Sequence, residues 1–223
     1  MCFQIYCPRG EAGVKMVPMA QVRPYRGIEA ADRVAERRRR FLEAGLDILG
    51  SDPDLSELTV RGICGRAGVA LRYFYESFPD KDDLVAAVFD WVIADIAATT
   101  QAAVAAAPLA EQSRAGMANI VRAIAADTRV GRLLFSSQLS NPVVVRKRTE
   151  SFALMALLTF QHAGTLGAQN SERIKAGSHF VVGGVAQMIT AWLEGDIALD
   201  NDQLVDQLAA MIDGLAVPDL YKG

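Results

Sequence analysis

Residues 59–84, TVRGICGRAGVALRYFYESFPDKDDL, decide the fold. Thr59 can cap a short helix that ends at Gly68, because Thr is a favoured N-cap residue and Gly a favoured helix stop. A second short helix is expected over residues 70–78, and Asp80 can cap a long helix after it. Two short helices joined by a brief glycine turn have the spacing of a helix-turn-helix.

The second short helix separates its side chains by direction. At about 100° per residue, one face is expected to be buried and carries Ala70, Leu71, Phe74 and Phe78. The opposite face carries Arg72 and Glu76, flanked by Tyr73 and Tyr75. Arg can pair with guanine, and Tyr can bond a phosphate oxygen or contact a thymine methyl group, so this face suits a DNA major groove. Glu76 either accepts from cytosine or repels the DNA backbone, and rim packing is the alternative role for the two tyrosines.

Two further basic features suit phosphate binding. Lys81 stands in the first turn of the long helix, where a cation opposes the helix dipole, so a docked anion such as a DNA phosphate would explain it. Arg37 to Arg40 form the densest basic run of the chain, and Arg37 and Arg40 are candidate phosphate contacts. The alternatives are a solvated lysine among aspartates and a solvated arginine face.

The rest of the chain predicts an all-α protein with about nine helices and no sheet, because helical spacing recurs and strand-type alternation is absent. We expect a disordered arm over residues 1–27, a helix-turn-helix domain over 28–80 and a helical ligand-binding and dimerisation body over 81–223. The expected helices span residues 29–50, 59–67, 70–78, 80–107, 109–127, 129–139, 142–163, 171–196 and 200–216.

The composition excludes several classes of protein. The 223 residues are 51% hydrophobic and carry a net charge of −3, no apolar run approaches the ~20 residues of a membrane span, and the start has no signal-peptide core. We therefore expect a cytoplasmic protein. The three cysteines and two histidines show no metal-ligand spacing, and neither a clustered nucleophile nor a phosphate loop is present. We expect no metal, no cofactor and no enzymatic activity.

The motif Thr59-Val60-Arg61 … Ile63 … Ala67-Gly68-Val69 … Phe74-Tyr75 … Phe78 … Lys81 … Leu84 resembles the signature of the tetracycline-repressor (TetR) family of transcriptional regulators. The preceding arginine-rich helix, with Phe41-Leu42-Glu43-Ala44-Gly45-Leu46, is similar too, and the close resemblance covers about residues 26–92. It implies a homodimer with a three-helix DNA-binding head and a divergent ligand-binding body. It also implies that Thr59, Tyr75 and Lys81 hold phosphates while Arg72 and Tyr73 face bases. The DNA-binding candidates are Arg37, Arg40, Thr59, Arg61, Leu71, Arg72, Tyr73, Tyr75 and Lys81.

The head departs from the family pattern at two positions. Ala70 stands where a Ser or Thr commonly caps the second short helix, and a missing cap costs about 1 kcal/mol. Gly62 lies inside the first short helix, where a glycine costs about 1 kcal/mol relative to alanine. We therefore expect a head that is mobile until DNA orders it.

The body offers candidates for a dimer surface and for a ligand pocket. Small and apolar residues on the last two helices suit a four-helix bundle between two chains, and they are Gly183, Gly184, Ala191, Leu204, Leu208, Met211, Ile212 and Leu215. Methionines, aromatics, one leucine and one histidine can line an adaptable apolar pocket, and they are Trp91, Met117, Phe135, Met155, Leu158, His162, Met188 and Trp192. For both sets the alternative is that they only form the chain's own core.

Two functional hypotheses follow from the sequence. The first is a ligand-responsive regulator that binds palindromic double-stranded DNA as a homodimer, acts as a repressor and is released by a small apolar inducer. The second is a helical small-molecule-binding protein whose head no longer reads DNA, given Gly62, Ala70 and Glu76. Neither hypothesis involves a membrane.

Overall fold

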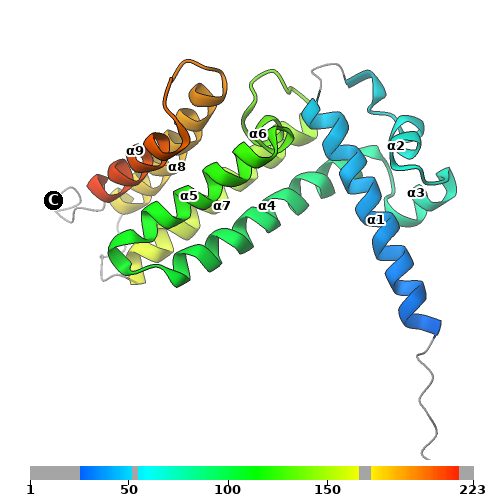
Figure 1. Ribbon diagram of the computed structural model, residues 1–223, viewed down its shortest axis with the longest axis horizontal. Helices are drawn as coiled ribbons and strands as arrows, with labels where there is room; N and C mark the ends of the chain where they lie inside the picture. The colour runs from blue at the N-terminus through cyan, green and yellow to red at the C-terminus, as the bar shows by residue number, and fades with distance from the viewer. Residues whose placement is uncertain (1–25, 52–54, 166–171, 216–223) are drawn as a thin grey trace, which may run out of the picture. The chain divides into compact units, whose positions relative to one another are not determined.

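The computed structural model describes residues 26–51, 55–165 and 172–215, without the side chains of 26–29 and 161–165. Most of the predicted arm lies outside this part of the chain. Nine α-helices fill it, together with one turn of 3₁₀ helix at Leu55–Glu57 and another at Leu109–Glu111, and no strand occurs within it, so the all-α prediction is confirmed. The helices are α1 (Arg26–Ser51), α2 (Val60–Ala67), α3 (Leu71–Ser77), α4 (Lys81–Ala106), α5 (Gln112–Ala126), α6 (Thr128–Phe135), α7 (Pro142–Thr165), α8 (Glu172–Leu193) and α9 (Asn201–Leu215) (Figure 1).

The chain divides into two units within α1. The first unit ends at Ala35, and its described part is the first portion of α1. The second unit begins at Glu36 and contains the remaining helices.

The predicted helix ends are built by their own side chains. Thr59 Oγ1 accepts a hydrogen bond of 3.0 Å from the amide of Gly62, and Asp80 Oδ1 accepts from the amides of Asp82 and Asp83 at 2.8 and 2.9 Å. Gly68 ends α2 with φ 61°, a left-handed conformation that glycine adopts without penalty. Ala70 starts α3 without a side-chain hydrogen bond, as its sequence predicts.

Gly62 has a role that the sequence analysis did not anticipate. A Cβ atom at this position would lie 2.3 Å from the backbone oxygen of Glu57, so the chain before α2 passes too close for any side chain. The expectation that Gly62 weakens α2 relative to alanine is therefore wrong, because alanine does not fit there.

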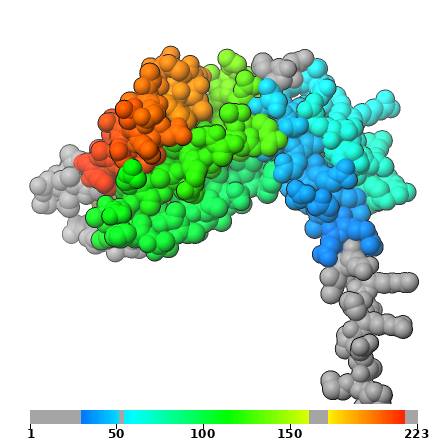
Figure 2. All heavy atoms as spheres, in the orientation of Figure 1, coloured from blue at the N-terminus to red at the C-terminus, as the bar shows by residue number. Residues whose placement is uncertain are grey.

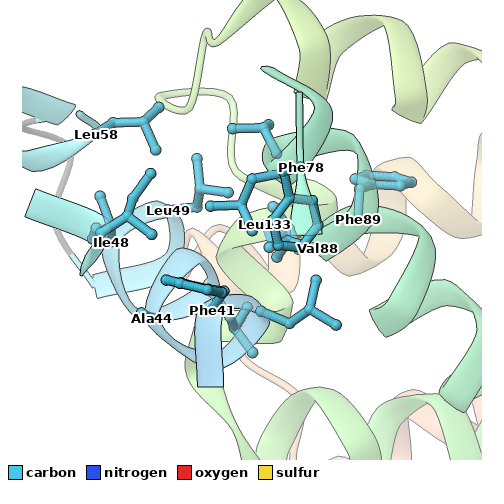
Figure 3. Close-up of a cluster of buried hydrophobic side chains, with 14 of the residues drawn as sticks. Phe41, Ala44, Ile48, Leu49, Leu58, Phe78, Val88, Phe89 and Leu133 are labelled. Carbon is cyan, nitrogen blue, oxygen red and sulfur yellow. The ribbon is translucent and has the colours of Figure 1, made fainter. Parts of the chain in front are cut away.

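The largest core joins α1, α2 and α3 to α4, α6 and the start of α7. Figure 3 shows its centre, where Phe41 and Leu49 from α1 meet Val88 and Phe89 from α4 and Leu133 from α6. These five side chains are at most 2% exposed. The predicted domain boundary between residues 80 and 81 remains a prediction. The main hydrophobic core contains side chains from both sides of it.

A second core joins α5 to α8 and α9. Figure 2 shows α9, in red, beside α5, in green, on the visible face. Leu204 and Leu208 are 0% and 1% exposed here, so they pack inside their own chain. The assignment of these two residues to a dimer surface is corrected, because α9 packs Leu204 and Leu208 into the second core.

No helix within the described residues is long and apolar enough to cross a membrane.

Candidate functional site

Phe74 anchors α3 to the rest of the head. Its side chain is fully buried, and its ring meets that of Phe41 edge-on with a centroid distance of 5.5 Å. Phe78, just after the helix, packs edge-on against the same Phe41 ring at 6.2 Å. Because α3 has only two turns, these contacts determine which of its faces points outward.

The outward face of α3 carries four exposed side chains, those of Leu71, Arg72, Tyr75 and Glu76. Leu71 is 45% exposed and Tyr75 60% exposed. The helical angles placed Leu71 on the buried face, and this is wrong, because α3 is buried only along the narrow stripe of its phenylalanine contacts. The exposure of the Leu71 side chain agrees instead with the prediction that Leu71 contacts DNA.

Tyr73 connects α3 to α1 instead of pointing straight outward. Its ring packs against the main core, and the guanidinium carbons of Arg37 and Arg72 each lie 4.4 Å from the ring centroid. Arg72 also donates a hydrogen bond to the Tyr73 hydroxyl. Cation–π contacts of this kind hold two basic groups beside one ring. Within the described residues, Arg72 has no carboxylate partner.

The arginine run on α1 holds the head together. Arg38 lies 4.3 Å above the Phe78 ring and donates to the carbonyl of Ser77 at 2.8 Å. Arg40 donates to the carbonyl of Gly68 at 3.4 Å, and Arg39 pairs with Glu36 at 3.0 Å. Neither a purely solvated face nor a purely phosphate-binding face describes the run, since its members also contact the turns that follow α2 and α3.

Three further candidates stand at the starts of the helices before and after α3. Thr59 is exposed and serves as the N-cap of α2, and Arg61 is exposed on the first turn of that helix. Lys81 begins α4, and its Nζ lies 2.8 Å from Asp82 Oδ1. Exposed pairs of this kind contribute little stability, so the Lys81 side chain remains available to an external anion.

An ion-pair cluster that the sequence analysis missed joins the head to α6. Asp47 on α1 pairs with Arg66 on α2 at 3.2 Å and with Arg129 on α6 at 2.8 Å. Arg129 also pairs with Asp127, which caps α6. The hydrogen bond from Arg129 lowers the pKa of the Asp47 carboxyl, with a smaller contribution from Arg66, and it lowers the pKa of Asp127 as well. The sequence shows these charges but not that they meet, since 82 residues separate Asp47 from Arg129.

This cluster predicts acid sensitivity. Because the folded-state pKa of Asp47 lies below its unfolded value, its stabilising effect is present above the unfolded pKa of about 3.9 and is lost as the pH falls through the folded pKa. We expect Asp47→Asn to lower the melting temperature at pH 7 and to narrow the gap from wild type as the pH approaches 3. Thermal unfolding at a series of pH values measures this, with Asp95→Asn on α4 as the control. A gap that is independent of pH would contradict the role of Asp47.

The body contains an open cavity of about 300 Å³ where α6, α7 and α8 meet. Its lining is mostly apolar or small and consists of Leu134, Phe135, Ser137, Arg148, Phe152, Gly183, Ala186, Gln187 and Thr190. The volume lies at the lower end of the range of roughly 300–1,000 Å³ that is usual for small-molecule sites. It is therefore the candidate ligand site.

The structure distributes the predicted pocket residues over several places. Phe135 lines the cavity, whereas Trp91 packs against the main core and Met117, Met188 and Trp192 pack against the second core. Met155 is half-buried on α7, and Leu158 is 46% exposed. The side chain of His162 lies outside the described residues. The sequence could not single out Phe135, because core and cavity use the same residue types.

Arg148, which the sequence analysis did not select, fastens α7 to the end of α6. Its five N–H donors reach carbonyl oxygens of residues 132, 133, 136 and 139 at 2.8–3.4 Å. Burial lowers the pKa of its guanidinium, and the carbonyl end of α6 offsets the charge. Arg148 therefore both lines the cavity and holds α7 against the end of α6.

Comparisons with known proteins agree on the fold. No family model and no curated protein sequence matches the chain. A regulator from Syntrophomonas wolfei superimposes with a TM-score of 0.67 at 14% identity, covering 82% of this chain and 95% of that one. A regulator from Streptomyces coelicolor gives 0.61 at 20% identity, covering 88% and 96%. Both are described as TetR-family transcriptional regulators. The protein has the TetR-family fold.

A third structure with this TetR-family fold carries a ligand. The transcriptional regulator FadR from Bacillus subtilis, solved in complex with stearoyl-CoA, superimposes with a TM-score of 0.60 at 15% identity, covering 81% of this chain and 98% of FadR. The predicted resemblance is therefore confirmed at the level of the fold.

Proposed function

We propose that the protein is a cytoplasmic transcriptional regulator that binds a palindromic operator as a homodimer, represses transcription and is released by a small apolar ligand. The observation that carries the proposal is the exposed face of α3. A helix anchored by one fully buried phenylalanine presents Leu71, Arg72, Tyr75 and Glu76 to solvent. The helices α2 and α3 stand where the resemblance to the TetR family leads us to expect a helix-turn-helix, which supports the same assignment.

The chemistry of this face suits base reading. Arg72 is free of carboxylates within the described part of the chain, and its contact with Tyr73 orders the guanidinium before DNA arrives. An ordered arginine loses less side-chain entropy on pairing with guanine. Thr59, Arg61 and Lys81, at the starts of the helices before and after α3, suit phosphate oxygens, which fix the position of a protein on DNA without reading its sequence. Arg37 and Arg40 complete the proposed contacts from α1.

A dimer follows from the small size of the reading surface. One two-turn helix touches few base pairs, so helix-turn-helix proteins pair two heads on half-sites about 34–36 Å apart. The small residues Gly183, Gly184 and Ala191 on α8 suit the contact between the two chains.

Ligand control follows from the connection between cavity and head. The lining is largely apolar, and the complex of FadR with stearoyl-CoA supports an apolar ligand class. A ligand beside Phe135 contacts the end of α6, while the start of α6 pairs with α1 through Arg129 and Asp47. A ligand that binds one position of α6 more tightly shifts the population of head positions accordingly.

The experiment separates base reading from phosphate binding. We expect Arg72→Ala to relax the sequence preference of DNA selected from a random pool and to weaken its best site about 10- to 100-fold, since one good bidentate contact is worth about 1–3 kcal/mol. Lys81→Ala should weaken all sequences alike and reduce the salt slope by about one. Arg114→Ala on α5, which removes an exposed arginine paired with Asp206, is the control and should change neither.

Two outcomes would overturn this proposal. If Arg72→Ala and Lys81→Ala bind DNA like the wild type, the face is assigned wrongly. If the wild type selects no sequence at all and still binds apolar ligands, the head does not read DNA, and Glu76 on its outward face is the residue to suspect.

A further inference from the structure

Glu76 is an exposed acidic residue in the last turn of α3. The carboxyl end of a helix carries a partial negative charge, so a carboxylate in the last turn is unfavourable there. No basic residue in the same turn offsets it. DNA phosphates would repel the carboxylate as well. Neither the stability of α3 nor a general attraction to DNA therefore explains a glutamate at this position.

The arginine on the same face does not neutralise Glu76. Arg72 stands four residues earlier, the spacing at which opposite charges pair on a helix. Its guanidinium carbon instead lies 4.4 Å from the centroid of the Tyr73 ring, and it donates a hydrogen bond to the Tyr73 hydroxyl. Among the residues that the structure describes, Glu76 forms no ion pair. The face thus presents one cation and one anion that do not neutralise each other.

The separation of the two charges allows each of them to contact its own base pair. The Cβ atoms of residues four apart on a helix lie about 5–6 Å from each other, which exceeds the ~3.4 Å of one base step. A guanidinium can only donate hydrogen bonds, and a carboxylate can only accept them. In the major groove guanine offers two acceptors, O6 and N7, whereas cytosine offers the N4 donor. Arg72 therefore suits a guanine, and Glu76 needs a base with a donor.

Cytosine and adenine both carry a donor in the major groove, and cytosine suits a carboxylate better. The N6 donor of adenine lies between two acceptors, its own N7 and O4 of the paired thymine. Both acceptors would repel a carboxylate that approaches N6. The N4 donor of cytosine has an acceptor, guanine O6, on one side only. Cytosine is thus the base that fits Glu76 best.

A carboxylate on the reading face also discriminates by the sequences that it rejects. A base without a donor would leave Glu76 without its water and without a hydrogen bond in return, and such a group is costly. Specificity is a difference between affinities, so a residue that weakens binding to wrong sequences raises specificity even where it lowers general affinity. This accounts for a residue that stabilises neither α3 nor the contact with phosphates.

We propose that Glu76 is a specificity-determining residue that accepts a hydrogen bond from cytosine N4 in each half-site, near the base pair whose guanine Arg72 contacts. The inference rests on the proposed function, because that function places α3 in the major groove. It adds a prediction about the operator, namely that each half-site contains a cytosine whose identity is fixed by a carboxylate. Loss of Glu76 then changes which sequence the protein prefers.

The first experiment selects DNA from a random pool with the full chain as wild type, Glu76→Gln and Glu76→Ala. We expect the wild type to select cytosine at one position of the half-site. Glu76→Gln should select adenine there, because an amide pairs bidentately with adenine N6 and N7. Glu76→Ala should lose the preference at that position and keep the guanine that Arg72 contacts. Glu111→Gln, at an exposed glutamate just before α5, is the control and should select the wild-type sequence.

One result of this selection would overturn the inference. If Glu76 only repels the DNA backbone, both variants at this position bind every sequence more tightly and select the wild-type motif unchanged. Because Glu76 is exposed and its charge is unfavourable for α3, neither variant is expected to unfold the head, and circular dichroism checks this.

The second experiment changes the DNA instead of the protein. N4-methylcytosine at the selected position keeps the N–H that pairs with guanine and lacks the N–H that faces the major groove. We expect this base to weaken binding of the wild type about tenfold, the effect of losing one specific base contact, and binding of Glu76→Ala less than about twofold. Fluorescence anisotropy of labelled best-site duplexes measures both affinities at one salt concentration, because salt alone changes them. Equal losses in the two proteins would overturn the inference.

Failure of this inference differs from failure of the proposed function. If the wild type selects a palindromic sequence in which no position depends on Glu76, the regulator stands and the assignment of Glu76 falls. If the wild type selects no sequence, the proposed function falls, and the assignment of Glu76 falls with it.

Discussion

Replacement of Phe41 by alanine is expected to lower the free energy of unfolding by about 3–5 kcal/mol, the range usual for a large aromatic removed from a core. The Phe41 side chain is fully buried. Its ring touches those of Phe74 and Phe78 edge-on, so truncation leaves a cavity under α3 and removes two aromatic contacts. Urea denaturation followed by circular dichroism measures the change.

Tyr75→Ala is the matched control for this prediction. Tyr75 also meets Phe74 edge-on, at 5.5 Å, but it is 60% exposed, so its loss should cost less than about 1 kcal/mol. In DNA binding we expect the reverse order, with Tyr75→Ala weakened more than Phe41→Ala, because Tyr75 lies on the proposed reading face. Equal losses of stability in Phe41→Ala and Tyr75→Ala would show that the aromatic cluster does not hold the head.

Local structure could be predicted well from the sequence because its causes are local. Thr59, Gly68 and Asp80 act on backbone groups two to four residues away, and each ends or begins a helix where its chemistry predicts. The angular separation of Phe74 from Arg72 follows from helical geometry alone. The fold class follows from the sum of such signals.

Long-range partners could not be predicted, because sequence spacing does not show which side of a helix is covered. Leu204 and Met211 lie on the same helix, yet only Leu204 turns towards α5. Likewise, Arg37 and Arg40 are adjacent to other arginines in the sequence, but their partners are Tyr73 and Gly68 on other elements. The cavity depends on such placements as well, which explains why Arg148 was missed.

In α2, replacement of either of two glycines by alanine is expected to change the stability of the protein, but in opposite directions. Gly65→Ala should stabilise the protein by about 0.5–1 kcal/mol, because alanine is the better helix former and nothing lies within 4 Å of the new Cβ atom. Gly62→Ala should destabilise it by about 1–3 kcal/mol, the usual cost of overpacking, because the new Cβ atom would lie 2.3 Å from the Glu57 backbone oxygen. A backbone oxygen cannot move aside by changing a rotamer.

Comparison of Gly62→Ala with Gly65→Ala separates the effect of the close backbone contact from the effect of helix propensity. Both substitutions lie in the same helix, one turn apart, and both add a single methyl group, so propensity alone predicts the same sign for both. Parallel urea titrations of the two variants measure the difference, which should be about 1.5–4 kcal/mol when the two effects are combined. If Gly62→Ala proves as stable as Gly65→Ala, the chain before α2 does not pass where the structure places it. Thr59, whose hydroxyl accepts from the Gly62 amide, would then also lose the position from which we propose that it contacts DNA.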